Sequence, residues 1–152
     1  RNNPGGFLSA AIDISSWFLP EGETVVIERG REEKYNKEYT SGGHFLSREY
    51  EMAILVNGGS ASASEIVAGA LQEHGRAKLV GTQTYGKGSV QELIKMKDDT
   101  ALKLTVAEWL TPGGLSISKE GLTPDVVIEL DADKLEKNGI DTQLEEAIKI
   151  LK

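Results

Sequence analysis

The feature that most constrains this chain is a run of small residues between two apolar segments. Residues 52–56 form a short unbroken apolar run, and residues 57–65 are almost wholly glycine, alanine, serine and asparagine before they end in Glu65. A helical apolar face follows, made by Ile66, Val67, Ala70 and Leu71. A strand, a small-residue loop and a helix in this order are typical of the start of an α/β crossover.

The rest of the chain alternates between segments of helix and strand character. Apolar residues at helical spacing predict helices at 8–18 and after a cap at Asp141 or Thr142, with one face made by Leu144, Ala147, Ile148 and Leu151. Residue patterns typical of strands occur at 24–28, 34–40, 52–56, 77–80, 90–96, 101–110 and 124–130. We expect 34–40 to be exposed or at an edge, 52–56 to be buried on both faces, and 90–96 to pair with 101–110. One mixed α/β domain without an internal linker is predicted.

Composition removes several classes of function. The 152 residues carry 17 Lys and Arg against 24 Asp and Glu, a formal net charge of −7, so nucleic acid is not a predicted partner. The absence of cysteine excludes disulfides, thiolate metal sites and thiol nucleophiles. No apolar run reaches the roughly 18 residues of a membrane span, and the chain opens at Arg1 with turn residues rather than a signal peptide. We therefore expect a piece of a longer protein.

Three serines, Ser60, Ser62 and Ser64, stand where the small-residue loop meets the helix. A hydroxyl at this point meets unpaired backbone N–H groups and the positive end of the helix dipole, an environment that suits a developing oxyanion. The same position is also the usual place of a helix-capping serine, and capping is the commoner role. The residues alone leave open which serine, if any, is a nucleophile.

A serine nucleophile needs a base, and the candidates are few. His74 lies at the far end of the same predicted helix, about 18 Å from Ser62, whereas His44, in a glycine-rich loop, stays open. Lys87 is the best-placed lysine, between Gly86 and Gly88 and before an apolar strand. Because an ordinary lysine has a pKa of about 10.4, a lysine base would have to be buried among apolar groups.

Two other motifs come close to known sites. The glycines at 81 and 86 with Lys87 nearly spell a phosphate-binding loop, but Gly88 stands where a hydroxyl should hold magnesium, and a strand rather than a helix is predicted to follow. Ser116 and Lys119 have the Ser-x-x-Lys spacing of penicillin-recognising enzymes, but the surrounding glycines and Pro124 predict a surface hairpin instead of a helix.

Five ordered motifs resemble the carboxyl-terminal processing proteases, or tail-specific proteases, of peptidase family S41. They are Arg1-x-Asn3-x-Gly5-Gly6, residues 59–65, Gly86-Lys87-Gly88-x-x-Gln91, Leu110-Thr111-Pro112, and Gly121-Leu122-Thr123-Pro124-Asp125. The resemblance implies that Ser62 is the nucleophile, Lys87 the general base and Gln91 the residue that orients the lysine. It also implies an oxyanion hole made by the backbone N–H of Ala63 and of Gly5 or Gly6. In a fully extended strand Lys87 and Gln91 would lie about 13 Å apart, so we expect a bend that brings them together.

The resemblance also carries expectations for the whole protein. It implies an α/β fold, a mixed sheet with flanking helices in a crotonase/ClpP-like spiral core whose N-terminal part lies outside this chain. Residues 1–152 would be the C-terminal part of the catalytic domain, with a core over about 1–130, a C-terminal helix over about 141–152, and no PDZ domain. By itself, such a piece is not expected to be active.

The function implied is a serine endopeptidase that cleaves proteins near accessible C-termini through an acyl-enzyme, without cofactor or metal. The parent is expected to be exported or membrane-anchored, in a bacterial periplasm or cell envelope, and a homo-oligomer is open. Two alternatives remain, a non-catalytic binding module of related fold and a crotonase-like acyl-CoA enzyme. The acidic composition offers the second of these few phosphate contacts.

Overall fold

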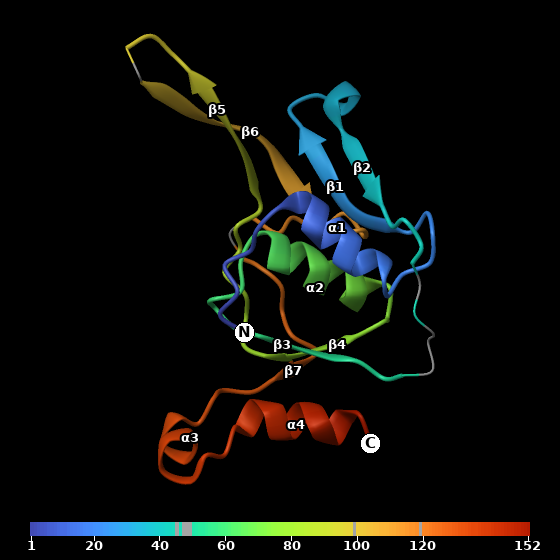
Figure 1. Ribbon diagram of the computed structural model, residues 1–152, viewed down its shortest axis with the longest axis vertical. Coiled ribbons are helices and arrows are strands. Elements are labelled where there is room, and N and C mark those ends of the chain that lie inside the picture. Colours follow the sequence, from blue (N-terminus) through green and yellow to red (C-terminus); the bar gives the residue numbers. More distant parts are fainter. Residues whose placement is uncertain (45, 47–49, 99, 119) are drawn as a thin grey trace.

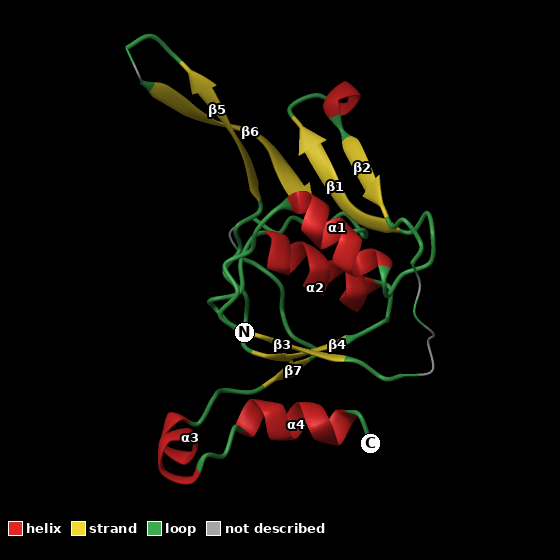
Figure 2. Ribbon diagram, viewed as in Figure 1, coloured by secondary structure: helices red, strands yellow, loops and turns green. Residues whose placement is uncertain are grey.

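The elements of the chain lie in stacked layers (Figures 1 and 2). The structure, a computed structural model, describes residues 1–44, 46, 50–98, 100–118 and 120–152. An antiparallel sheet lies at one end, helices α1 and α2 lie beneath it, a parallel sheet follows, and helices α3 and α4 lie beyond that sheet. The helices are α1 Leu8–Ser16, α2 Ala63–Glu73, α3 Ala132–Asn138 and α4 Thr142–Ile150. This arrangement confirms the predicted α/β class with flanking helices.

The antiparallel sheet has the strand order β2-β1-β6-β5. Its strands are β2 Lys37–Thr40, β1 Thr24–Gly30, β6 Ala101–Leu110 and β5 Ser89–Lys95. The predicted pairing of 90–96 with 101–110 is confirmed, and β2 lies at an edge as expected, although Glu33–Tyr35 forms the short 3-10 helix η1 ahead of it. The far end of the β5–β6 hairpin projects from the body (Figure 1).

The parallel sheet has the order β3-β4-β7, with β3 Ala53–Val56, β4 Lys78–Gly81 and β7 Val126–Val127. The expectation that 52–56 is buried on both faces is wrong, because in β3 only Val56 is fully buried. In the described sheet β3 is also an edge strand. The strand expected over 124–130 is reduced to the two residues of β7. In this sheet β3 runs directly into the small-residue loop that precedes α2, so the α/β crossover predicted from the sequence is confirmed.

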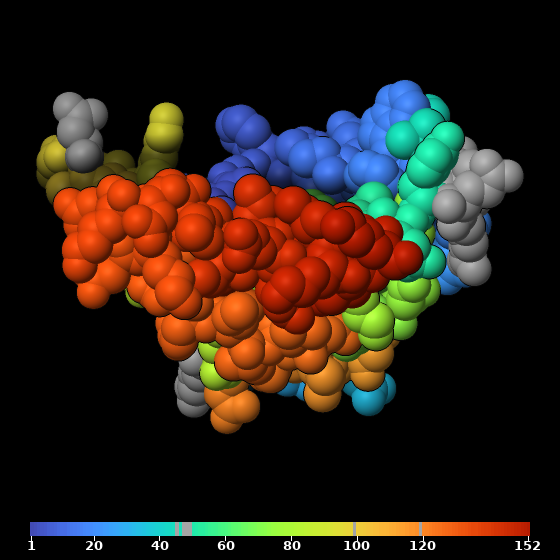
Figure 3. Space-filling model, turned by 90° about the horizontal axis from the view of Figure 1, so that it is seen from below, coloured from blue at the N-terminus to red at the C-terminus, as the bar shows by residue number. Residues whose placement is uncertain are grey.

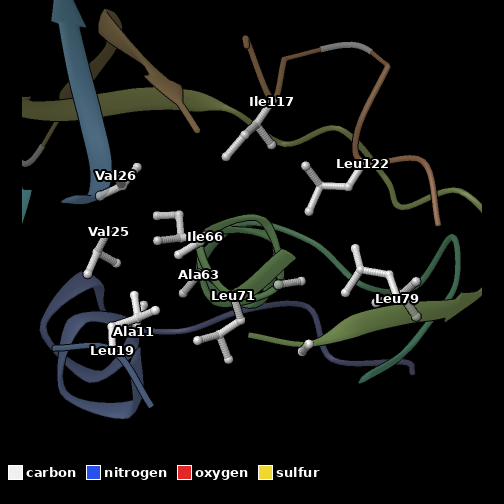
Figure 4. Close-up of a cluster of buried hydrophobic side chains, with 14 residues drawn as sticks. Ala11, Leu19, Val25, Val26, Ala63, Ile66, Leu71, Leu79, Ile117 and Leu122 are labelled. Atoms are coloured by element: carbon white, nitrogen blue, oxygen red, sulfur yellow. The ribbon is translucent and has the colours of Figure 1, made fainter. Parts of the chain in front are cut away.

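Helix α2 is the centre of the core (Figure 4). Its Ile66 and Leu71 are almost fully buried, and apolar side chains from α1, β1, β4 and the 117–122 segment converge on it. Fully burying a side chain such as Leu71 contributes about 1.5–3 kcal/mol. Gly69 permits a close contact, since a Cβ there would lie 3.2 Å from the Thr111 side chain. The core therefore fixes α2, and with it the loop at the N-terminus of α2.

Helix α4 packs against β3 and β4 on the outer side of the parallel sheet, and α3, which buries no residue, lies beside α4 on the same side of the molecule (Figure 3). The Asp141 carboxylate caps α4 by accepting a hydrogen bond from the Leu144 N–H, as the sequence predicted. The expected apolar face is only partly buried, because Ala147 is inside whereas Leu144 and Ile148 are each 44% exposed. Helix α3 has no counterpart among the predicted elements.

Candidate active site

Ser62 adopts a backbone conformation that is rare for residues with a side chain. It immediately precedes α2, with φ 59° and ψ −124°. Such a conformation costs about 1–3 kcal/mol, and residues held in it cluster at functional sites. The strain turns the chain sharply from the loop into the helix and leaves Ser62 half-buried at the helix N-terminus.

The neighbouring serines have structural hydrogen bonds of their own. The Ser60 hydroxyl is buried and accepts a hydrogen bond from the Asn57 N–H at 3.2 Å. The Ser64 hydroxyl contacts the carbonyls of Asn3 and Ala61 at 2.8 and 2.9 Å. Ser62 also takes part in a structural contact, the capping box with Glu65 at the start of α2, so what distinguishes it from the other two serines is its strained backbone.

Residues 1–6, which we call the 1–6 arm, lie against the Ser62 turn. A hydrogen bond from the Ala61 N–H to the Asn3 carbonyl, 2.9 Å long, joins them. Gly5 has φ +101°, and a Cβ at this position would lie 2.7 Å from the Ser62 Cβ and 2.8 Å from the Ala63 nitrogen. Only glycine fits such an approach, which explains the first glycine of the Gly-Gly pair.

Two backbone N–H groups beside Ser62 are available to a ligand. Gly5 donates its N–H to the Asn3 side chain at 3.0 Å. Within the part of the chain that the structure describes, the N–H groups of Gly6 and Ala63 donate no hydrogen bond. Ala63 is the first residue of α2, where the helix dipole favours negative charge. The site therefore has donors and a field that suit an oxyanion.

A buried carboxylate joins the Ser62 turn to the loop that carries Lys87. Glu65 is 0% exposed, and it accepts hydrogen bonds from the N–H of Ser62, Gly86 and Lys87 and from the Thr84 hydroxyl, at 2.5–2.9 Å. The backbone of the predicted base is therefore tied to the backbone of the predicted nucleophile.

The Lys87 side chain itself is exposed. It borders an open hollow of about 400 Å³, here called the Lys87 hollow, which is also lined by Pro4, Gly58, Gly59, Ala61 and Tyr85. The burial that the sequence argument required of a lysine base is absent, because most of these neighbours are small and cannot cover the long side chain. In the described residues, the Lys87 side chain makes no hydrogen bond to Ser62 or to Gln91.

Gln91 lies on β5 with an exposed side chain. The strand pairing shifts register between Val90 and Gln91, so the segment after Lys87 is bulged rather than regularly extended. A bend of this kind was expected, but the contact between Gln91 and Lys87 stays a prediction. Gly88 allows the segment to pass close to its neighbour, since a Cβ there would lie 2.5 Å from the Ser118 nitrogen.

The two histidines have other surroundings. His74, at the C-terminal end of α2, lies 2.7 Å from the Thr24 carbonyl through Nε2, and 3.4 Å from Glu23 through Nδ1. The ring of His44 lies against Trp17, with centroids 5.5 Å apart. His74 is therefore excluded as the base, as its sequence position indicated.

Neither the sequence resembling a phosphate-binding loop at 81–88 nor the Ser-x-x-Lys sequence at 116–119 forms the site that it resembles. The strand β5 follows Lys87 where a phosphate-binding loop needs a helix. Ser116 pairs with Leu110 in an isolated β-bridge, and Lys119 lies outside the described residues.

Across the residues that are described, no group of three or more His, Asp or Glu side chains could hold a metal ion. None of the described helices is long and apolar enough to cross a membrane.

The motif at 121–125 is hydrogen-bonded to the elements that carry the candidate site. The Thr84 hydroxyl, besides donating to Glu65, accepts a hydrogen bond from the Leu122 N–H at 2.7 Å. Asp125 accepts hydrogen bonds from the Leu79 N–H and the Gln72 amide. Burial alone would raise the pKa of Asp125, but these bonds and the nearby Lys78 ammonium hold it below its usual value. The 121–125 motif thus anchors α2, β4 and the loop before Lys87.

Sequence reasoning missed the contacts of Glu65 and Thr84. The available signal was the Ser-x-x-Glu spacing from Ser62 to Glu65, which is typical of a capping box. That pattern predicts the bond from Ser62 N–H to Glu65. It does not predict the three donors from residues 84–87, which depend on the tertiary fold.

Comparison with known proteins gives one consistent answer. The model of peptidase family S41 matches residues 1–128. A carboxy-terminal-processing protease of Bartonella bacilliformis is 50% identical over 129 residues, which are 85% of this chain and 30% of that protein. Carboxyl-terminal-processing peptidase 3, chloroplastic, of Arabidopsis thaliana is 40% identical over 153 residues, covering 97% of this chain and 29% of that protein.

A solved structure agrees with these relatives. The photosystem II D1 C-terminal processing protease superposes with a TM-score of 0.78 at 31% identity, over 99% of this chain and 37% of that one. The chain spans less than a third of the length of the two curated relatives. The family match includes the 1–6 arm, the Ser62 turn, the Lys87 loop and the 121–125 motif. The chain belongs to peptidase family S41.

Proposed function

We propose that the whole protein is a serine endopeptidase that cleaves protein substrates near their C-termini, with Ser62 as nucleophile and Lys87 as general base. The observation that carries the proposal is the strained turn at Ser62, which lies at the N-terminus of α2 beside two unused N–H donors. Membership of family S41 and relatives with carboxyl-terminal-processing names support the reaction class.

The chemistry is acyl transfer. Neutral Lys87 takes the proton of the Ser62 hydroxyl as the oxygen attacks the scissile carbonyl carbon, and the C–N bond then breaks as the leaving amine is protonated. Water hydrolyses the resulting ester and regenerates Ser62. Each step needs stabilisation of negative charge on the former carbonyl oxygen, which preorganised N–H donors supply best.

The oxyanion hole in this proposal uses the N–H groups of Gly6 and Ala63. The Gly5 N–H is already bonded to Asn3, so it is a poorer donor than that of Gly6. Gly5 has a steric role instead, because its missing Cβ lets the 1–6 arm reach the Ser62 turn.

In this proposal, the exposed Lys87 amine must be shielded from water and turned toward Ser62 before it can accept a proton. Its backbone is held close to that of Ser62 by Glu65. In the proposed reaction its side chain, which borders the Lys87 hollow, would turn toward the Ser62 hydroxyl. A peptide in the hollow would exclude water from the lysine, and desolvation favours the neutral amine. Gln91 would orient the amine once it has turned inward.

The same reasoning extends to the rest of the protein. Residues 1–152 would be the C-terminal part of the catalytic domain, and capture of substrate C-termini by strand addition would belong to a PDZ domain outside this chain. We place the work of the protein outside the cytoplasm or in a lumen, as the chloroplastic and bacterial relatives suggest. Membrane anchoring and self-association can be checked by cell fractionation and sedimentation of the whole protein.

The decisive experiment measures cleavage of an unstructured protein with a free C-terminus by the whole protein. Ser62→Ala and Lys87→Ala should each reduce cleavage by at least about 10³-fold while leaving the protein folded, with Ser62→Ala losing about 0.5–2 kcal/mol of stability because it removes the helix cap. Ser9→Ala and Lys95→Ala, both exposed positions, are matched controls that should retain activity. Full cleavage by Ser62→Ala would reject the proposal and favour a non-catalytic module.

A further inference from the structure

Glu65 is buried more completely and bonded more extensively than a helix cap requires. Its side chain is 0% exposed, and within the described residues it forms no ion pair with a lysine, arginine or histidine. Burying a carboxylate without a cation costs several kcal/mol unless hydrogen bonds replace its hydration. In the capping box that Ser62 and Glu65 form, the only donor that the Glu65 carboxylate needs is the Ser62 N–H. The other three donors come from the loop that leads to Lys87.

The two carboxylate oxygens divide these donors in a specific way. Oε2 accepts from the Ser62 N–H at 2.8 Å and from the Lys87 N–H at 2.9 Å. Oε1 accepts from the Thr84 hydroxyl at 2.5 Å and from the Gly86 N–H at 2.7 Å. Because one oxygen bonds both nitrogens, the backbones of Ser62 and Lys87 cannot separate by more than the two bond lengths combined.

The bonds also act on the conformation of each partner. The bond to the Ser62 N–H helps to hold the strained φ of 59°, which no local propensity favours. The bonds to Gly86 and Lys87 fix the start of a segment whose glycines would otherwise leave it many conformations. All of these partners are backbone groups or Thr84, so the carboxylate does not touch the reacting atoms.

We propose that Glu65 is a positioning residue that fixes the distance and orientation between the Ser62 nucleophile and the Lys87 base, an inference that rests on the function proposed above. A displacement of about 1 Å at a catalytic pair can reduce the rate by about 10²-fold. Because the carboxylate is fully buried, we expect it not to contact the substrate directly. The effect of changing it therefore falls on kcat rather than on KM.

The main test is Glu65→Gln in the whole protein. Glutamine has the same shape, but its NH2 group must face either the N–H groups of Ser62 and Lys87 or the N–H of Gly86, so a donor meets a donor in both orientations. We expect kcat to fall by about 10²-fold with KM changed by less than about twofold. Glu73→Gln is the matched control, since Glu73 lies at the other end of α2 and accepts from the Gly113 N–H. It should keep wild-type kcat.

A second pair of variants separates positioning from loss of folding. Thr84→Val keeps the shape of the side chain but removes the donor to Glu65 and the acceptor of the Leu122 N–H, whereas Thr84→Ser keeps both. For enzyme shown by circular dichroism to be folded, Thr84→Val should lower kcat by about tenfold, the effect of losing the hydrogen bond to Glu65, and Thr84→Ser should restore most of it. This pair decides the question if Glu65→Gln does not fold.

The variants distinguish a failure of the positioning role of Glu65 from a failure of the proposed Ser62–Lys87 dyad. If Ser62→Ala and Lys87→Ala abolish cleavage but a folded Glu65→Gln keeps wild-type kcat, the positioning role is overturned and the dyad stands. Equal kcat for folded Thr84→Val and wild type also overturns it. If Ser62→Ala cleaves normally, the dyad itself is rejected. A fall in kcat that Thr84→Ser rescues supports the positioning role.

Discussion

The two halves of the candidate site are fixed to different degrees. On one side, the Ser62 backbone is held by its strained turn, by the close approach of Gly5 and by the bond to Glu65. On the other side, only the backbone of Lys87 is held, and its side chain is exposed at the Lys87 hollow. The nucleophile half is therefore formed by folding alone. To act as the base proposed above, Lys87 needs an additional group, such as a substrate, to cover it.

The largest expected effect comes from changing the base without removing its charge. Arginine at position 87 keeps a long cationic side chain but stays protonated, so it cannot accept the Ser62 proton. We expect Lys87→Arg to lower kcat by at least about 10³-fold, the upper range of a general base's contribution, with an unchanged melting temperature. Lys95→Arg, on exposed β5, is the control. A Lys87→Arg enzyme that retains activity would mean that Lys87 acts only as a cation.

A smaller effect is expected from disturbing the nucleophile half. A Cβ at Gly5 would overlap the Ala61 carbonyl and the Ser62 Cβ, so Gly5→Ala must push the 1–6 arm away from the turn. We expect kcat to fall by about 10²-fold, as for the loss of one oxyanion donor, together with a lower melting temperature.

Gly22→Ala is the control for backbone strain at Gly5. Gly22 has φ +83°, and no atom lies within 4 Å of the position that an alanine methyl group would take. The change at Gly22 therefore costs only about 1 kcal/mol of strain and leaves kcat intact. Equal kcat for the Gly5 and Gly22 variants would show that the 1–6 arm does not shape the site.

The sequence predicted the nucleophile half better than the base half. The small residues of 57–65 and the apolar face of α2 are local patterns, and the strand–loop–helix unit follows from them. They do not single out Ser62 among the three serines, a choice that came from the resemblance to family S41. The surroundings of Lys87 depend on where the 1–6 arm, Gly58 and Tyr85 meet in space. No local pattern contains that information, so the expectation of a buried lysine was not met.

Other differences have the same physical origin. The 52–56 run is apolar enough for a strand covered on both faces, but in β3 only Val56 is fully buried. Of the apolar face predicted for α4 only Ala147 is buried, and the other buried position is the polar Gln143, which was not on that face. The Gln143 side chain is held there by bonds to the Ile128 carbonyl and to Arg1. Periodicity locates a helix, whereas polar partners of this kind decide which face is turned inward.

The smallest expected effect concerns the anchor of the 1–6 arm. The Arg1 guanidinium donates to both carboxylate oxygens of Asp141, so the arm of the nucleophile half is tied to the start of α4. The hydrogen bond from Arg1, joined by that from the Leu144 N–H, lowers the pKa of Asp141 below its usual value. Asp141→Asn keeps an N-cap acceptor but loses the charge, so we expect a loss of at most about 1 kcal/mol at pH 7.

The pH dependence of the stability difference between wild type and Asp141→Asn tests whether the Arg1–Asp141 ion pair causes that difference. Because the pKa of Asp141 is lower in the folded protein than in the unfolded chain, its contribution is complete above about pH 4 and is lost as the pH falls through the folded-state value. The difference in melting temperature between wild type and Asp141→Asn should therefore be constant from pH 7 to pH 5 and should vanish at lower pH. A difference that persists in acid would assign the effect to the helix cap. In that case the 1–6 arm would be held by its contacts with the Ser62 turn, and the nucleophile half would not depend on α4.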